Sequence, residues 1–295
     1  MSTERRETFK TPGAVRLDIR NGAGEVRLDA GAGEAETTVV LEPLRDNEAS
    51  IEAVQTARLE LHERADGHDV VVDVRGRGRN FGFSRGAEVL VAITCPTETS
   101  VEVNTGSADI EGRGLFKRVD IETGSGDVQF GDISEDAEVS AASGDVQVSL
   151  IGGEGRLNTA SGDVQVGMIG GDGRVNSASG DVMIRTAGGR LEVNSASGDV
   201  LIKEALGSVS INTASGDQQI GSVFHDSVSM KSASGDLRVG IQQGSRLFID
   251  ARSRSGDVSS ELPVSDTPPP EGESPLIELR VNTMSGDITI HRAGS

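Results

Sequence analysis

One four-residue stretch, Ser-Gly-Asp-Val, recurs through this chain and constrains its fold more than any other feature. It occurs at residues 143–146, 161–164, 179–182 and 197–200, and looser copies stand before and after these. When the serine is numbered position 1, it recurs every 18 residues from Ser107 to Ser215 and then falls at Ser234, Ser255 and Ser285. A fixed period near 20 residues is typical of stacked repeat units.

Within each repeat, apolar residues alternate with polar ones. They stand at positions 4 and 6, as in Val182 and Ile184, at positions 13 and 15, as in Leu191 and Val193, and at position 9 from Leu115 onward. A spacing of two predicts two short strands per repeat, each with one face turned inward. One repeat cannot bury that face alone, but repeats stacked about 4.8 Å apart can. We therefore predict an all-β fold, a single-stranded β-solenoid with rungs of 18 residues.

Two polar columns accompany the apolar ones. Glycine at position 2 predicts a corner with positive φ, and Ala108 breaks this column, so its corner either differs or is strained. Asparagine stands at position 16 in four consecutive rungs and is expected to form hydrogen bonds along the stack: Asn158, Asn176, Asn194 and Asn212.

Aspartate occupies position 3 in ten rungs, from Asp109 to Asp287. Either each carboxylate accepts a backbone N–H at its own corner, or the column binds cations that relieve its repulsion. Calcium-binding solenoids use a nine-residue repeat with aspartate in another phase, which favours the first interpretation. The candidate cation ligands are Asp127, Asp145, Asp163, Asp181, Asp199, Asp217 and Asp236.

The chain is expected to fall into three parts. Residues 1–12 are polar and predicted to be loose, and residues 107–292 form the array, interrupted by a Pro-rich loop at 263–275. Between them, 13–106 is predicted to be a β-rich cap with a degenerate first repeat at 23–26 and one short helix, which Asp46 can cap. The rung of Ser285 comes last in the sequence, so its edge is expected to be exposed and open to self-association.

Composition limits the partners and the compartment. A net charge of −19 argues against nucleic-acid and anionic-membrane partners. Cys95 is the only cysteine, so no intrachain disulfide can form. The first residues contain no apolar secretory segment, and no run approaches the roughly 20 apolar residues of a membrane span. We expect a cytoplasmic protein without a cofactor.

No catalytic pattern stands out in the sequence. The four histidines are scattered, and a column of identical carboxylates lacks the two environments that acid–base catalysis needs. Residues 82–86 match G-x-S-x-G, but a basic, Gly-rich stretch precedes them and a strand, not a helix, is expected to follow. We predict that the protein is not an enzyme.

Two places could contact a partner. The stretch 75–86 interleaves basic and aromatic residues, which suits either a solvated loop or single-stranded nucleic acid, and its candidate contacts are Arg77, Arg79, Phe81 and Phe83. Outward position 5 is usually glutamine, yet it is Met183 and Leu201 in adjacent rungs, so these stacked apolar residues are a second candidate.

The segment Cys95-Pro96, Val101, Val103 and Thr105-Gly106-Ser107, followed by the Ser-Gly-Asp-Val array, resembles a bacterial family of β-strand-repeat proteins. This family carries the label "putative adhesin", and related domains are called toastrack. The resemblance covers about residues 13–292. It implies a right-handed, β-helix-like solenoid, no known enzyme activity and no assigned functional residues. Some members of the family are associated with the cell envelope.

Three functional hypotheses remain open. The first is a non-catalytic scaffold or protein-interaction module whose partner is another protein. The second is an adhesin-like protein of the cell envelope or surface, and the third is a solenoid that responds to a cation such as calcium.

Overall fold

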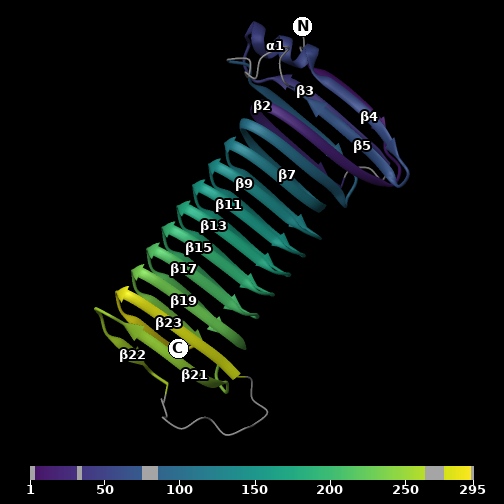
Figure 1. The fold of residues 1–295 in the computed structure, drawn as a ribbon. Helices are drawn as coiled ribbons and strands as arrows, with labels where there is room; N and C mark the ends of the chain where they lie inside the picture. The colour runs from purple at the N-terminus through teal and green to yellow at the C-terminus, as the bar shows by residue number, and fades with distance from the viewer. Residues whose placement is uncertain (1–3, 32–34, 75–85, 263–275, 294–295) are drawn as a thin grey trace. The chain divides into compact units, whose positions relative to one another are not determined.

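The computed structural model describes residues 4–31, 35–74, 86–262 and 276–293, and these form an all-β structure with one helix (Figure 1). The chain divides into two compact units, residues 1–152 and residues 153–295. Parallel strands stack into a β-solenoid in each unit, which confirms the predicted fold class. We call one turn of the solenoid a rung.

The first unit contains ten strands and the helix among its described residues. They are β1 (Arg5–Lys10), β2 (Ala14–Ala30), β3 (Glu36–Pro43), α1 (Glu48–Thr56), β4 (Arg58–Arg64), β5 (Gly67–Asp73), β6 (Val89–Cys95), β7 (Thr99–Ser125), β8 (Val128–Ile133), β9 (Ala137–Ser143) and β10 (Val146–Ile151).

The second unit is built from strands alone in its described part. They are β11 (Gly155–Ser161), β12 (Val164–Ile169), β13 (Gly173–Ser179), β14 (Val182–Ala187), β15 (Leu191–Ser197), β16 (Val200–Ala205), β17 (Val209–Ser215), β18 (Gln218–Val223), β19 (Asp226–Ser234), β20 (Leu237–Ile241), β21 (Arg246–Ser253), β22 (Val258–Ser260), β23 (Leu276–Ser285) and β24 (Ile288–Arg292).

From β11 to β18, neighbouring rungs of the second unit pair in parallel with the 18-residue register that the repeat predicts. On β13 and β15, Val175 lies opposite Val193, and on β14 and β16, Ile184 lies opposite Ile202. All four side chains are fully buried. Each buried aliphatic side chain contributes about 1.5–3 kcal/mol, so the inward columns supply stability in every rung.

The corner glycines have the positive φ expected of position 2. Gly180 and Gly198 have φ of 113° and 122°, and a Cβ on Gly198 would lie 2.1 Å from the carbonyl oxygen of Gly180. Ala108 is not among the described residues with positive φ, so its corner differs from the others rather than being strained.

The rungs at the end of the second unit are not stacked in sequence order. β23 pairs on one side with β19 and on the other with β21 (Figure 1). β24 likewise pairs on one side with β20 and on the other with β22. The expectation that the rung of Ser285 exposes its edge is therefore wrong, because both of its edges are paired. The strands with an unpaired edge in the described part of this unit are β21 and β22.

A similar insertion occurs in the first unit. β2 pairs with β5 and β6 on one side and with β7 on the other. Gly24 of β2 lies opposite Ala108 and has φ of 122°, so residues 23–26 are indeed a degenerate repeat. Antiparallel strands β3 and β4 then cover the outer edges of β6 and β5.

Three local expectations for the first unit are wrong. Residues 5–10 are not loose, because β1 pairs antiparallel with β3. The helix is capped by Asn47 rather than Asp46, since the Asn47 side chain accepts the Ser50 N–H at 2.7 Å. At position 9, a register shift between β7 and β8 turns Phe116 inward instead of Leu115, and its ring meets Phe130 edge-on at 5.3 Å.

Candidate functional site

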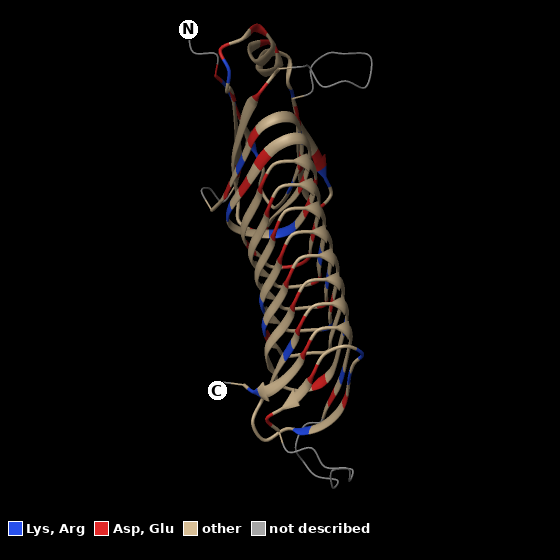
Figure 2. Ribbon diagram, turned by 90° about the vertical axis from the view of Figure 1, so that its left-hand side faces the viewer, with Lys and Arg blue, Asp and Glu red and all other residues tan. Residues whose placement is uncertain are grey.

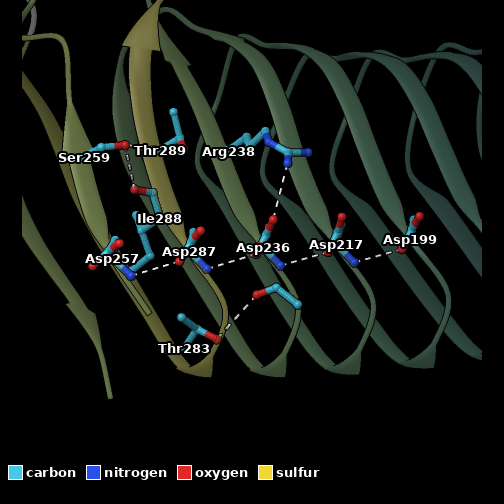
Figure 3. A network of polar contacts seen from close by, with 11 residues as sticks. Asp199, Asp217, Asp236, Arg238, Asp257, Ser259, Thr283, Asp287, Ile288 and Thr289 are labelled. Atoms are coloured by element: carbon cyan, nitrogen blue, oxygen red, sulfur yellow. Dashed lines mark hydrogen bonds and ion pairs between the residues drawn. The ribbon is translucent and has the colours of Figure 1, made fainter. Parts of the chain in front are cut away.

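The aspartate column forms a hydrogen-bonded ladder from rung to rung. In the second unit, each aspartate of the column from Asp181 onward donates its backbone N–H to Oδ1 of the aspartate one rung before it in the stack, at 2.8–2.9 Å. Figure 3 shows the last five members in their spatial order: Asp199, Asp217, Asp236, Asp287 and Asp257. Two such bonds, at 3.0 and 2.9 Å, join Asp109, Asp127 and Asp145 in the first unit.

This ladder corrects the expectation that each carboxylate accepts an N–H at its own corner. The donor is the N–H of the next rung, and a charge-assisted bond of this kind is stronger than a neutral one. Figure 2 shows acidic positions recurring from rung to rung. Among the described residues, no group of three or more His, Cys, Asp or Glu side chains is placed to hold a metal ion. The hydrogen bonds themselves tie each rung to the next one.

The asparagine column also forms a ladder, as predicted. The side-chain amides of Asn176, Asn194 and Asn212 each donate to Oδ1 of the asparagine one rung before, at 2.9, 3.1 and 3.0 Å. These bonds use outward side chains of β11, β13, β15 and β17, so they tie neighbouring strands together on that face.

The two apolar residues at outward position 5 lie side by side. Met183 on β14 is opposite Leu201 on β16 in the parallel register, and glutamines flank them on β12 and β18. Met183 is 40% exposed and Leu201 is half-buried. Met168, on β12 next to β14, adds a third apolar side chain that is 39% exposed.

Two basic side chains accompany this apolar pair. Arg185 follows Met183 by two residues on β14, and Lys203 follows Leu201 by two residues on β16, so they share the outward face. Both are exposed, and neither has an ion pair with another described residue. We call these four residues together with Met168 the apolar–basic patch. Glu204, whose carboxylate accepts a long hydrogen bond of 3.5 Å from Thr186, is the nearest acid on these strands.

Sequence analysis found only part of this patch. It singled out Met183 and Leu201 but missed Met168, Arg185 and Lys203. Position 7 carries Gly167 and Gly221 in the rungs on either side, so the change to two consecutive basic residues was a signal in the sequence.

The other predicted contacts lie elsewhere. Arg77, Arg79, Phe81 and Phe83 fall outside the described residues, as does the Pro-rich segment 263–275. The structure therefore tests neither interpretation of the stretch 75–86.

The single cysteine of the chain lies in the described part of the first unit. Cys95 is buried, and burial raises the pKa of its thiol to about 11, which keeps it protonated at neutral pH. Helices long and apolar enough to span a membrane are absent from the described residues.

The parallel pairing of strands from rung to rung defines the protein as a β-solenoid. The family model Toastrack DUF4097 matches residues 16–222 and again residues 156–291. The chain belongs to this family, which confirms the resemblance seen in the sequence. The family is a domain of unknown function, and it is not an enzyme family.

Solved structures resemble the chain over its length at low identity. A "putative adhesin" from Bacteroides fragilis is 9% identical, with 98% of this chain and 96% of that chain covered and a TM-score of 0.36. A "putative lipid binding protein" from Parabacteroides distasonis is 11% identical, with 97% and 96% covered and a TM-score of 0.43. These values are too low to carry a functional argument. No curated protein matches the chain.

Proposed function

We propose that this protein is a non-catalytic interaction module that binds an acidic polypeptide segment with apolar anchors. The observation that carries the proposal is the apolar–basic patch, in which Met183 and Leu201 stand beside two cations without ion pairs among the described residues.

The patch differs from its surroundings in both charge and polarity. Elsewhere on the outward faces, arginines usually have an acidic neighbour, as in the 3.0 Å pair of Arg174 with Glu192. The chain has a net charge of −19, so two basic side chains on adjacent strands, neither in an ion pair with another described residue, form a local positive region. They would attract an acidic partner and orient it, while the apolar pair gives up contact with water on binding.

The patch also has a geometry that suits an extended peptide. Parallel strands place Met183 and Leu201 about 4.8 Å apart, and the basic residues repeat that spacing two residues further on. Methionine adapts its shape to different apolar partners, so the patch can accept more than one anchor.

The test is a pull-down with the full chain as bait from cells of the source organism, followed by mass spectrometry. The double variant Met183→Asp/Leu201→Asp removes the apolar pair, and Arg185→Glu/Lys203→Glu reverses the charge. We expect both to lose the same acidic partner, with affinity reduced about tenfold or more, since loss of about 1.4 kcal/mol suffices for that.

The matched control is Gln129→Asp/Gln147→Asp, which places the same acids at the exposed position 5 of β8 and β10, on strands that carry no patch residue. It should retain the partner, and thermal melts should show that all variants are folded. Capture that is identical for the patch variants and the control would contradict the proposal. So would patch-dependent binding to vesicles of anionic lipid in place of a protein, because that result would identify a membrane surface as the partner.

A further inference from the structure

The outermost rung of the second unit, formed by β21 and β22, has an apolar interior that no described residue covers. Leu247 and Ile249 are only half-buried, whereas Ile277 and Leu279, their partners on β23, are fully buried. Val258 on β22 is 48% exposed, whereas Ile288 opposite it is fully buried. In this rung, the inward-facing apolar side chains are therefore partly exposed, whereas the equivalent side chains of β23 and β24 are buried.

The backbone edge of this rung is also unpaired within the described part of the chain. β21 pairs with β23 alone and β22 with β24 alone. Arg254 donates its backbone N–H to Thr283 on the β23 side. Because successive N–H groups of a strand point to opposite sides, those of Ala251 and Ser253 point to the open edge.

Exposed apolar side chains gather near this edge. Phe248 on β21, Val258 on β22 and Met284 on β23 are 53%, 48% and 57% exposed, and they are the most exposed large apolar residues of the described chain. An open strand edge with apolar residues is a ready site for pairing with another strand. In the first unit, by contrast, antiparallel strands β3 and β4 cover the outermost parallel rung.

We propose that this edge pairs with the same edge of a second copy of the chain, giving a symmetric dimer. A two-fold axis normal to the strands sets β21 against β21 and β22 against β22, both antiparallel. The half-buried columns of the two copies then bury each other, as they do between rungs.

The charges on β21 favour the register centred on Ala251 over the two registers next to it. Because the open-edge N–H groups belong to odd-numbered residues, odd residues must lie opposite odd ones and even opposite even. When Ala251 lies on the axis, Asp250 of each copy meets Arg252 of the other. Placing the axis at 250 or 252 instead opposes two like charges, which is destabilising. Within one chain Asp250 and Arg252 already form an ion pair at 2.8 Å, so the dimer would join two pairs into a group of four charges.

Sedimentation velocity of the full chain over a dilution series tests the dimer. Wild type should show a monomer–dimer equilibrium. Arg252→Asp should weaken it about tenfold or more, because two symmetry-related contacts become like-charged. The swap Asp250→Arg/Arg252→Asp should restore dimerisation, since opposite charges again face each other.

The control Arg174→Asp breaks an exposed ion pair on β13, away from the edge, and should leave the dimer unchanged. Melting curves show whether each variant is folded. A wild type that stays monomeric at every concentration would overturn the proposal. It would also be overturned by growth into open-ended polymers, by a dimer that Arg252→Asp leaves intact, or by a folded swap variant that stays monomeric.

Discussion

At the residue scale, the corner Ser-Gly-Asp combines a backbone requirement with an inter-rung bond. The glycine takes a φ that other residues avoid, and the aspartate accepts the N–H of the next rung. The repeat predicted both residue types but assigned the wrong donor to the carboxylate. An aspartate that closes its own turn and one that bridges to a neighbouring strand look the same in sequence, because both accept a backbone N–H.

The corner glycine gives a direct test at this scale. Gly198→Ala should destabilise the protein by about 1–3 kcal/mol or more, because φ of 122° is strained for alanine and the new Cβ would lie 2.1 Å from a carbonyl oxygen. Denaturant unfolding measures the loss. Ser197→Ala, at the exposed neighbouring position, should change stability by no more than about 0.5 kcal/mol. Equal effects of the two changes would contradict the role of the glycine.

At the element scale, register brings like charges together as well as apolar residues. Asp120 of β7 lies opposite Glu138 of β9. Burial raises the pKa of Asp120, and the carboxylates of Glu138 and Glu102 raise it further. A carboxyl group whose pKa is higher in the folded state costs stability at neutral pH, and the cost disappears as pH falls below the pKa of the folded state.

Asp120→Asn should therefore stabilise the protein at pH 7, by about 0.5 kcal/mol for a surface strand pair. The gain should vanish at a pH low enough to protonate Asp120 in the wild type. Unfolding curves at neutral and acidic pH, run in parallel on wild type and variant, measure both effects. A gain of the same size at both pH values would mean that shape or packing, not charge, is responsible.

At the scale of the whole molecule, net charge dominates the electrostatics. A charge of −19 opposes compaction through self-repulsion. The carboxylates of the aspartate ladder contribute to this repulsion, and each one joined to the next rung offsets part of it with a backbone hydrogen bond.

Salt should therefore raise the melting temperature by screening the repulsion between carboxylates. The rise should be steepest below an ionic strength of about 0.1 M, where the Debye length is still longer than about 10 Å. Calcium chloride at matched ionic strength should raise it no further than sodium chloride, because the ladder already uses Oδ1 for backbone bonds. Melting curves in the two salts measure this. A rise specific to calcium would instead favour the cation-responsive hypothesis by ligand linkage.

Part of the candidate site could be predicted from the sequence. Met183 and Leu201 stood out because they replace glutamine in an otherwise regular column, and the structure places them side by side. Arg185 and Lys203 were missed because single basic residues on a surface strand are ordinary. The structure shows that their strands pair and that neither has an acidic partner among the described residues. These two observations together identify Arg185 and Lys203 as part of the candidate site.

The sequence by itself determined the cross-section of each rung. An 18-residue period sets the register, alternation sets which side chains face inward, and glycine marks the corner, because all three follow from local backbone geometry. Only the tertiary structure decided the order in which rungs stack, with β2 inserted in the first unit and β23–β24 in the second. The physical reason is that strand edges of this repeat are nearly equivalent hydrogen-bonding partners. Which edges pair therefore depends on the path of the segments that connect the rungs. The 18-residue period contains no information about that path.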